Sequence, residues 1–164
     1  MAIKPIEAAD YRRIIGQFAT GVTVLTTAND GLLHGMTANA ITSVSLDPLR
    51  LLVCVEKAAH SHEQFTQSGR FTVNILAEDQ EAVSRIFAAT SEPEQGRLQG
   101  VAFHLGANGA PVIEGCLAYI ECTVADHFEV GDHTIFIGGV DNATVVREAT
   151  PLLFYQGKYR RLAD

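Results

Sequence analysis

The sequence predicts a mainly β (α+β) fold, a β-barrel with short flanking helices. About six or seven segments combine Val, Ile, Thr and Phe at strand length, with turn residues between them. The helical segments are short and do not alternate regularly with strands, which disfavours a doubly wound parallel sheet. The 164 residues fit one domain over 1–164, because no linker, repeat or low-complexity tract divides them.

The first element expected is a helix over residues 11–18. Asp10 stands at its N-cap position and Gly21 follows its end. Residues 22–27, dense in Val and Thr, predict a strand, and the turn at 29–31 (Asn-Asp-Gly) predicts a hairpin. The helix is indicated by apolar residues at i, i+3, i+4 and i+7, namely Tyr11, Ile14, Ile15 and Phe18.

The middle of the chain contains a polar segment, an apolar strand, a short helix and a further strand. Residues 37–46 are rich in small hydroxyl and amide side chains, whereas residues 49–55 form a continuous apolar strand that we expect to be buried on both faces. Residues 61–64 have the S-x-x-Q form of a capping box, so a short helix begins there and ends at Gly69. Residues 71–76 predict another strand.

The rest of the chain predicts one more helix and three more strands. Val83, Ile86 and Phe87 mark a short helix from about residue 78 to 88. Residues 90–109, rich in Ser, Glu, Gly and Gln, predict an exposed loop. The strands are expected over residues 112–124, 134–146 and 152–159.

Charge and hydropathy exclude several classes of partner. Twelve basic against nineteen acidic residues give a net charge of −7, the opposite of the balance typical of nucleic-acid-binding proteins. Apolar runs such as residues 51–55 fall far short of the roughly 18 residues that a membrane span needs. The N-terminus lacks the basic-then-apolar pattern of a secretory signal. We therefore expect a cytoplasmic protein without nucleic-acid or membrane partners.

Cysteine and histidine spacings do not indicate a disulfide or a metal site. Cys54, Cys116 and Cys122 form no Cys-x-x-Cys motif, and we expect free buried thiols in a reducing compartment. Cys116 and Cys122 fall in one predicted strand, about 20 Å apart, too far for a disulfide. No two of the six histidines have the i, i+4 spacing of a zinc helix, so no metal is expected.

Two polar segments are candidates for ligand binding, since P-loop, G-x-G-x-x-G and G-x-S-x-G motifs are absent. Hydroxyls and main-chain donors of residues 37–45 suit a phosphate or the amide edge of a ring, although an ordinary exposed strand face has the same composition. In residues 131–138, His133 stands at the mouth of a long apolar strand. A histidine at this position can hydrogen-bond to a ligand, but an exposed histidine at the end of a hairpin is an equally good interpretation.

Together these segments resemble the short-chain flavin reductases, the reductase components of two-component flavin-dependent monooxygenases. The resemblance spans about residues 11–161, in family order. The matching segments are 18–27 (FATGVTVLTT), 35–48 (GMTANAITSVSLDP), 52–57 (LVCVEK), 60–62 (HSH), 68–76 (SGRFTVNIL), 131–138 (GDHTIFIG) and 151–155 (PLLFY).

The resemblance implies an FMN-binding split β-barrel, a homodimer, and hydride transfer from NADH or NADPH to FMN or FAD. Reduced flavin then diffuses to a partner oxygenase. His133 and Tyr155 are implied at the place where nicotinamide stacks on flavin, His133 as the catalytic residue. The implied flavin-binding residues are Thr37, Ala38 and Asn39 at the ring, Ser43 and Ser45 toward the ribityl chain and phosphate, Cys54, Val55 and Glu56 through their backbone, Ser61 and His62 at the phosphate, and Phe71 and Asn74 in the wall.

Several alternatives stay open at this point. The residues do not distinguish FMN from FAD or NADH from NADPH. A flavin-binding electron-transfer protein with permanently bound FMN would share residues 37–45, and so would a flavin-dependent reductase of a corrinoid or ferric complex. Lys57 and Arg85 are the basic residues nearest the matching segments, and each is either a phosphate partner or a solvated surface charge.

Overall fold

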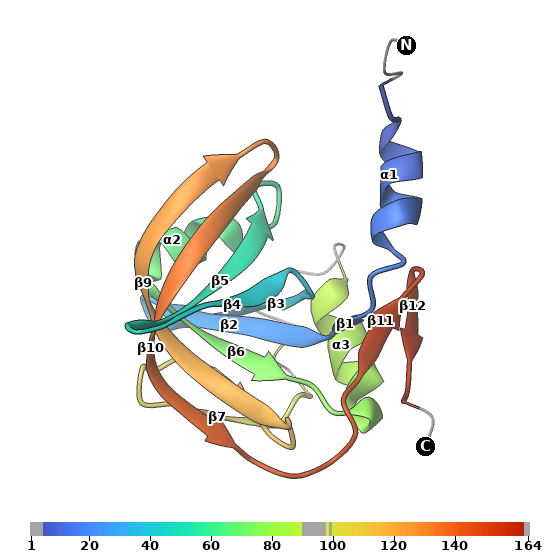
Figure 1. The fold of residues 1–164 in the computed structure, drawn as a ribbon. Helices are drawn as coiled ribbons and strands as arrows, with labels where there is room; N and C mark the ends of the chain where they lie inside the picture. Colours follow the sequence, from blue (N-terminus) through green and yellow to red (C-terminus); the bar gives the residue numbers. More distant parts are fainter. Residues whose placement is uncertain (1–4, 90–97, 99, 163–164) are drawn as a thin grey trace.

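The computed structural model describes residues 5–89, 98 and 100–162, and in these the chain is mainly antiparallel β-sheet (Figure 1). A seven-stranded sheet has the order β3-β2-β6-β9-β10-β5-β4, beside a three-stranded sheet β1-β11-β12 and a hairpin β7-β8. The elements, in chain order, are α1 (Ala8–Ile15), β1 (Thr20–Gly21), β2 (Thr23–Asn29), β3 (Leu32–Ala38), β4 (Ile41–Leu46), β5 (Leu49–Glu56), α2 (His62–Ser68), β6 (Arg70–Ile75), the 3-10 helix η1 (Glu78–Gln80), α3 (Glu81–Ala88), β7 (Phe103–Leu105), β8 (Pro111–Ile113), β9 (Ala118–Val130), β10 (His133–Val145), β11 (Leu153–Tyr155) and β12 (Lys158–Arg160).

Several local predictions are confirmed. Strands β2 and β3 form the expected hairpin, and its turn places Asp30 and Gly31 at positive φ, which the Asn-Asp-Gly sequence tolerates. Helix α2 ends at Gly69 in the left-handed conformation. The helix expected near residues 78–88 is the pair η1 and α3, and the strand expected at 71–76 is β6.

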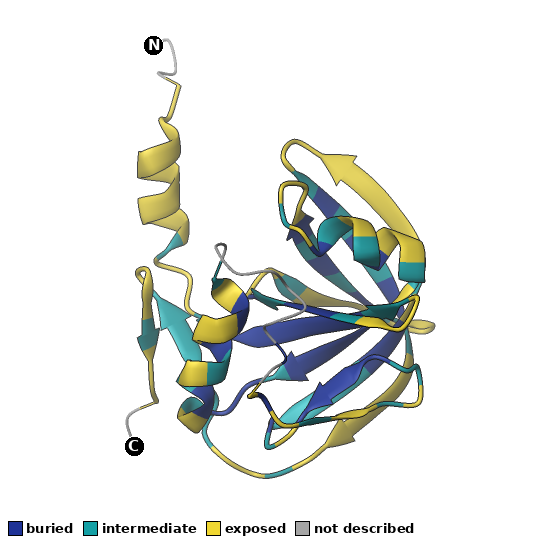
Figure 2. Cartoon of the chain, turned by 180° about the vertical axis from the view of Figure 1, so that it is seen from behind, coloured by how far each residue is buried: buried dark blue, intermediate teal, exposed yellow. Residues whose placement is uncertain are grey.

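The curved sheet carries two apolar clusters, and its central strands β2 and β6 are buried on both faces. Phe65 on α2, Phe71 on β6 and Phe136 on β10 form the centre of one apolar cluster inside it. A second cluster, around Leu76 and Phe87, joins α3 to the end of the sheet. Figure 2 shows these buried segments in dark blue between exposed outer strands and helices.

The two edge strands of the large sheet are neighbours in sequence. Strands β3 and β4 stand at opposite ends of the strand order, yet only Asn39 and Ala40 separate them. The backbone N–H of Cys54 donates to the carbonyl of Ala40 at 3.0 Å, which fixes this link against β5. The two edges therefore meet at residues 39–40, although the strand ladder itself does not close.

Two predictions about the N-terminal half are wrong. Helix α1 starts three residues earlier than the periodicity indicated, so Asp10 lies in its first turn, and it ends at Gly16. Strand β5 is not buried on both faces: Leu51, Val53 and Val55 are buried, while the alternate residues are half-exposed. Those half-exposed apolar residues face a cavity, which explains why the strand is apolar throughout.

The predictions for the C-terminal half were too coarse. Of the loop expected at 90–109, residues 90–97 and 99 lie outside the described residues, and part of the remainder is strand β7. The segment 112–124 contains β8 and the start of β9, with Cys116 in the connection, so Cys116 and Cys122 do not share a strand. The segment 152–159 is the hairpin β11–β12. All three cysteines are free.

Helix α1 stands away from the body of the molecule (Figures 1 and 2). None of its residues is buried, and its apolar side chains face solvent in the single chain: Tyr11, Ile14 and Ile15 are half-exposed and the following Phe18 is 72% exposed. In the part of the chain that the structure describes, no helix has the length and apolar character needed to cross a membrane.

Candidate ligand-binding site

A cavity of about 500 Å³ lies between β3, the turn after β5, the end of α3 and the C-terminal hairpin. This volume lies within the usual range of small-molecule sites. Small side chains leave much of the space open, because Ala38, Ala58, Ala59, Ala88 and Ala89 all line it. Such walls suit a flat ring.

Ser61 supplies the one lining hydroxyl whose hydrogen bonding is incomplete. The residue is fully buried, and its Oγ has no hydrogen-bond partner among the described residues. It is the N-cap residue of α2, but its side chain does not cap the helix. A buried hydroxyl without a partner costs about 1–3 kcal/mol, so a ligand acceptor such as a phosphate oxygen would satisfy it. Ser61 is thus a candidate donor in the wall of an otherwise largely alanine-lined cavity.

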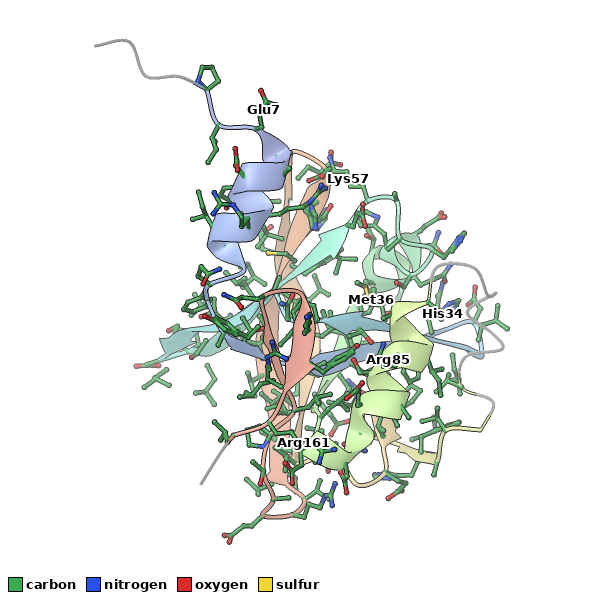
Figure 3. All side chains as sticks on the ribbon, turned by 90° about the vertical axis from the view of Figure 1, so that its right-hand side faces the viewer. Glu7, His34, Met36, Lys57, Arg85 and Arg161 are labelled. Carbon is green, nitrogen blue, oxygen red and sulfur yellow. The ribbon has the colours of Figure 1, made fainter. Side chains whose placement is uncertain are left out.

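Ser84 of α3 holds the wall of this cavity in place. Its carbonyl accepts a hydrogen bond from Thr37 Oγ1 on β3 at 2.6 Å, and its hydroxyl is 2.8 Å from Tyr159 Oη on β12. Arg85 lies over the Tyr159 ring, 4.8 Å from its centroid. Figure 3 shows Arg85 on α3 beside the C-terminal hairpin. Thr37 thus fastens the strand to the helix, and its hydroxyl proton is already donated.

A second cavity, of about 810 Å³, adjoins the first. Its wall includes α1, the link after β3, the half-exposed face of β5 and the turn of the C-terminal hairpin, and it is mostly apolar. Cys54 and Tyr155 line it, and burial raises the pKa of the Cys54 thiol. Asn39 and Phe154 line both cavities.

About half of the expected site residues lie at these cavities. Thr37, Ala38, Asn39, Glu56 and Ser61 line the first, and Asn39, Cys54 and Tyr155 line the second. Residues separated by over a hundred positions in the sequence are thus brought together.

His133 lines neither cavity but lies close to the first. It begins β10 and pairs in register with Glu56, a residue of the first cavity. Directly paired residues present their side chains on the same face of a sheet. The ring is 44% exposed, and its Nδ1 is 2.8 Å from Asp132 Oδ1. The carboxylate accepts from the ring, and this bond holds the pKa of Asp132 below its usual range.

Besides His133, six of the expected residues line neither of these cavities, and His62 is one of them. Val55, Phe71 and Asn74 are fully buried in the sheet, where the Asn74 amide donates to the Val24 carbonyl and accepts from the N–H of Ile113. Ser43 and Ser45 line a separate hollow of about 150 Å³ on β4.

His62 and the two candidate basic residues already have partners. His62 Nε2 is 2.7 Å from Thr134 Oγ1. Lys57 forms an ion pair with Glu129 at 2.9 Å, and Arg85 pairs with Glu81 at 2.6 Å. The Lys57 hydrogen bond lowers the pKa of Glu129. Neither Lys57 nor Arg85 lines a cavity.

Phe154 and Tyr159 are cavity residues that the sequence reasoning missed. The resemblance covers residues 151–155 but implies a role there for Tyr155 alone. Phe154 and Tyr155 both line the second cavity, but only Phe154 also lines the first. The available signal was Gly157 in the middle of residues 152–159, because a turn there folds the segment into a hairpin and pairs Phe154 with Tyr159. In the described part of the chain, no three His, Cys, Asp or Glu side chains gather as a metal site.

The structure is a mainly β protein with two neighbouring cavities that share Asn39 and Phe154 in their walls. The chain belongs to the flavin reductase like domain family, whose model matches residues 15–163. The resemblance seen in the sequence is thereby confirmed.

Named relatives cover nearly the whole chain. The flavin-dependent monooxygenase reductase subunit HsaB of Mycobacterium tuberculosis is 39% identical over 156 residues, 94% of this chain and 82% of the relative. The NADH-dependent FAD reductase of Streptomyces globisporus is 41% identical over 163 residues, 98% of this chain and 89% of the relative.

Solved structures agree with this assignment. The NADH:FAD oxidoreductase SgcE6 of Streptomyces globisporus superimposes with a TM-score of 0.91 at 41% identity, covering 100% of this chain and 98% of that one. It has also been solved with NAD and FAD fragments. BorF, the flavin reductase component of a bacterial two-component tryptophan halogenase, gives 0.90 at 39% identity, covering 96% of this chain and 99% of that one.

Proposed function

We propose that this protein is an NAD(P)H:flavin oxidoreductase that supplies reduced FMN or FAD to a partner monooxygenase. The observation that carries the proposal is the pair of adjoining cavities, one of which contains the unpaired buried hydroxyl of Ser61. Two ligands that exchange a hydride must lie in contact, and adjoining cavities allow this. Relatives named as NADH-dependent FAD reductase and monooxygenase reductase subunit support the same activity.

The first cavity is the proposed flavin site. Ser61 Oγ would donate to the flavin phosphate, and the alanines of the cavity would lie against the ring. Asn39 and the main chain beside it would meet the polar edge of the ring. Bound flavin supplies the hydride acceptor, and the nicotinamide ring supplies the hydride from C4. The protein's contribution is position and electrostatics, so the site needs no strong base or nucleophile.

His133 is the proposed contact for nicotinamide at the rim of the first cavity. Its ring is partly exposed and one strand away from Glu56, and its Nε2, the nitrogen not bonded to Asp132, can hydrogen-bond to a ligand amide. His133→Ala should reduce NAD(P)H turnover much more than flavin affinity. Equal losses of both, or no loss, would contradict this role.

The activity itself is tested by NADH and NADPH oxidation with and without added FMN, FAD and riboflavin. We expect saturable oxidation that depends on added flavin, with the best pair naming both preferences. Tight flavin binding without oxidation by either nucleotide would favour an electron-transfer protein with permanently bound FMN. Faster turnover with a corrinoid or ferric acceptor would favour a reductase of that acceptor.

A homodimer is part of the proposal. Helix α1 presents an apolar face that no other described element covers, and it borders the second cavity. A second copy of the chain would bury Ile14 and Phe18, since exposed apolar patches of this kind are typical of subunit interfaces. Light scattering should give twice the chain mass, and Ile14→Glu should shift it toward the monomer. A monomer mass for the unaltered protein would refute the dimer.

The same proposal includes a split β-barrel and a cytoplasmic location. The meeting of edge strands β3 and β4 at residues 39–40 supports a barrel that is open along that line. Three free cysteines and the need for NAD(P)H favour a reducing compartment. Fractionation of cells that produce the protein would test the location.

A further inference from the structure

The two cavities meet at one point in the structure. Asn39 and Phe154 are the residues common to both walls. Asn39 Nδ2 donates to Thr20 Oγ1 at 3.1 Å, and Thr20 is the strand partner of Phe154 in the ladder of β1 and β11. The two shared residues are therefore joined through Thr20, and they form the part of the wall that the two cavities have in common.

The Phe154 ring is held from behind by α3. Phe154 and Tyr159 face each other across the hairpin β11–β12, with ring centroids 5.6 Å apart and planes at 70°. Tyr159 Oη is 2.8 Å from the hydroxyl of the fully buried Ser84, and Arg85 covers its ring. A Tyr hydroxyl bonded to a buried helix residue fixes the ring, and an edge-to-face pair transmits that orientation to its neighbour.

We propose that Phe154 is the residue that aligns the nicotinamide ring against the flavin ring, and that Tyr159 is the positioning residue that orients Phe154. The inference rests on the proposed function. It deepens that function by assigning alignment to an apolar side chain, whereas His133 would act at the cavity rim. Phe154 has no ionisable group, so its effect comes from contact and shape alone.

The expected effect is on turnover more than on affinity. Ser61 and the alanine-lined wall of the first cavity lie outside the junction, so flavin should still bind when Phe154 is shortened. Hydride transfer requires the reacting atoms about 3–3.5 Å apart, and a misplacement of about 1 Å costs up to about 100-fold. Replacing the ring by Leu removes the flat surface that sets this distance.

The test compares Phe154→Leu and Tyr159→Phe with matched controls. Phe103→Leu is the control for Phe154, because Phe103 is also half-buried against the same apolar cluster but lines neither cavity. Tyr119→Phe removes a hydroxyl outside both cavities. Circular dichroism and thermal unfolding establish that each variant folds. Phe154→Tyr keeps the ring and serves as the conservative variant.

Three readouts separate alignment from binding. Fluorescence quenching gives the FMN dissociation constant, steady-state rates give kcat and KM, and tetrahydro-NADH added to the FMN-bound protein gives the charge-transfer absorption of stacked rings. For Phe154→Leu we expect kcat to fall by about tenfold or more and the charge-transfer band to weaken. Flavin affinity should stay within about threefold of that of the unaltered protein. Tyr159→Phe should lower kcat and weaken the charge-transfer band by smaller amounts. Phe154→Tyr should have a kcat and a charge-transfer band close to those of the unaltered protein.

Two outcomes would overturn the inference. A kcat and charge-transfer band for Phe154→Leu equal to those of Phe103→Leu would show that the ring does not align the ligands. A parallel loss of flavin affinity would make Phe154 a general binding residue. If the unaltered protein oxidises neither nucleotide with any flavin, the proposed function fails, and the charge-transfer measurement then decides the alignment separately.

Discussion

Replacing Ser61 with Ala should stabilise the ligand-free protein and weaken its binding of phosphorylated flavins. The Ser61 hydroxyl is fully buried without a partner among the described residues, so its removal relieves a cost of about 1–3 kcal/mol. No helix cap is lost, because the side chain does not cap α2. The helix instead starts from the Ser61 carbonyl, which accepts from the Phe65 N–H at 3.1 Å.

The cost of the same change in binding follows from the lost phosphate contact. A hydrogen bond to a charged group contributes about 1.5–3 kcal/mol, which corresponds to about 10- to 150-fold in the dissociation constant. Riboflavin has no phosphate, so its affinity should change little. Ser84→Ala is the matched control: Ser84 is equally buried but bonded to Tyr159, so its replacement should destabilise the protein by about 1 kcal/mol.

Urea unfolding without ligand and fluorescence titrations with FMN and riboflavin measure both effects. The reasoning fails if Ser61→Ala lowers the free energy of unfolding as Ser84→Ala does. It also fails if affinities for FMN and riboflavin fall together, since the hydroxyl would then not meet the phosphate.

Three further outcomes are expected. A Cβ at Gly138 would lie 2.7 Å from Cζ of the buried Phe71, so Gly138→Ala should lower the free energy of unfolding by about 1–3 kcal/mol. In a double-mutant cycle measured by urea unfolding, the loss caused by Gly138→Ala should be smaller when Phe71 is replaced by Leu. Additive effects of the two substitutions would contradict the contact. Iodoacetamide at pH 8 should label Cys54 first in mass spectra of the native protein, because burial raises the pKa of the other two thiols to about 11 and about 12, and equal labelling would argue against their burial. Arg147 lowers the pKa of Asp79, so their ion pair stabilises the fold fully above the ordinary pKa of an aspartate and less as the pH falls through the lowered value. Asp79→Asn should therefore reduce the fall of the urea unfolding midpoint with decreasing pH in the acid range. An unchanged pH dependence would contradict the pairing.

Local patterns were sufficient for most of the elements, because turn residues and alternation act over a few positions. They could not place side chains at the site. The hydroxyls of Ser43 and Ser45 lie on the outer strand β4, and Asn74 is used inside the sheet by partners on β2 and β8. Both facts depend on which way each strand faces, and composition does not encode that.

Contacts between residues far apart in the sequence could not be predicted either. Thr37 has a type and position that suit a ligand, yet its hydroxyl donates to Ser84, 47 residues later. Phe154 is a cavity residue only because the hairpin β11–β12 folds back onto α3. Ser61, by contrast, lines the first cavity as the resemblance implies, but its hydroxyl does not cap α2 as the S-x-x-Q pattern would suggest, and it has no partner among the described residues.

The link at residues 39–40 belongs both to the cavity walls and to the line where the two edge strands of the sheet meet. Asn39 lines both cavities, and Ala40 is bonded to β5, so a molecule bound there touches the line along which the sheet is open. Any ligand that binds only the folded chain adds RT ln(1 + [L]/Kd) to its stability. A reductase that releases its flavin after each turnover would therefore be more resistant to unfolding and proteolysis when cellular flavin is plentiful than when it is scarce.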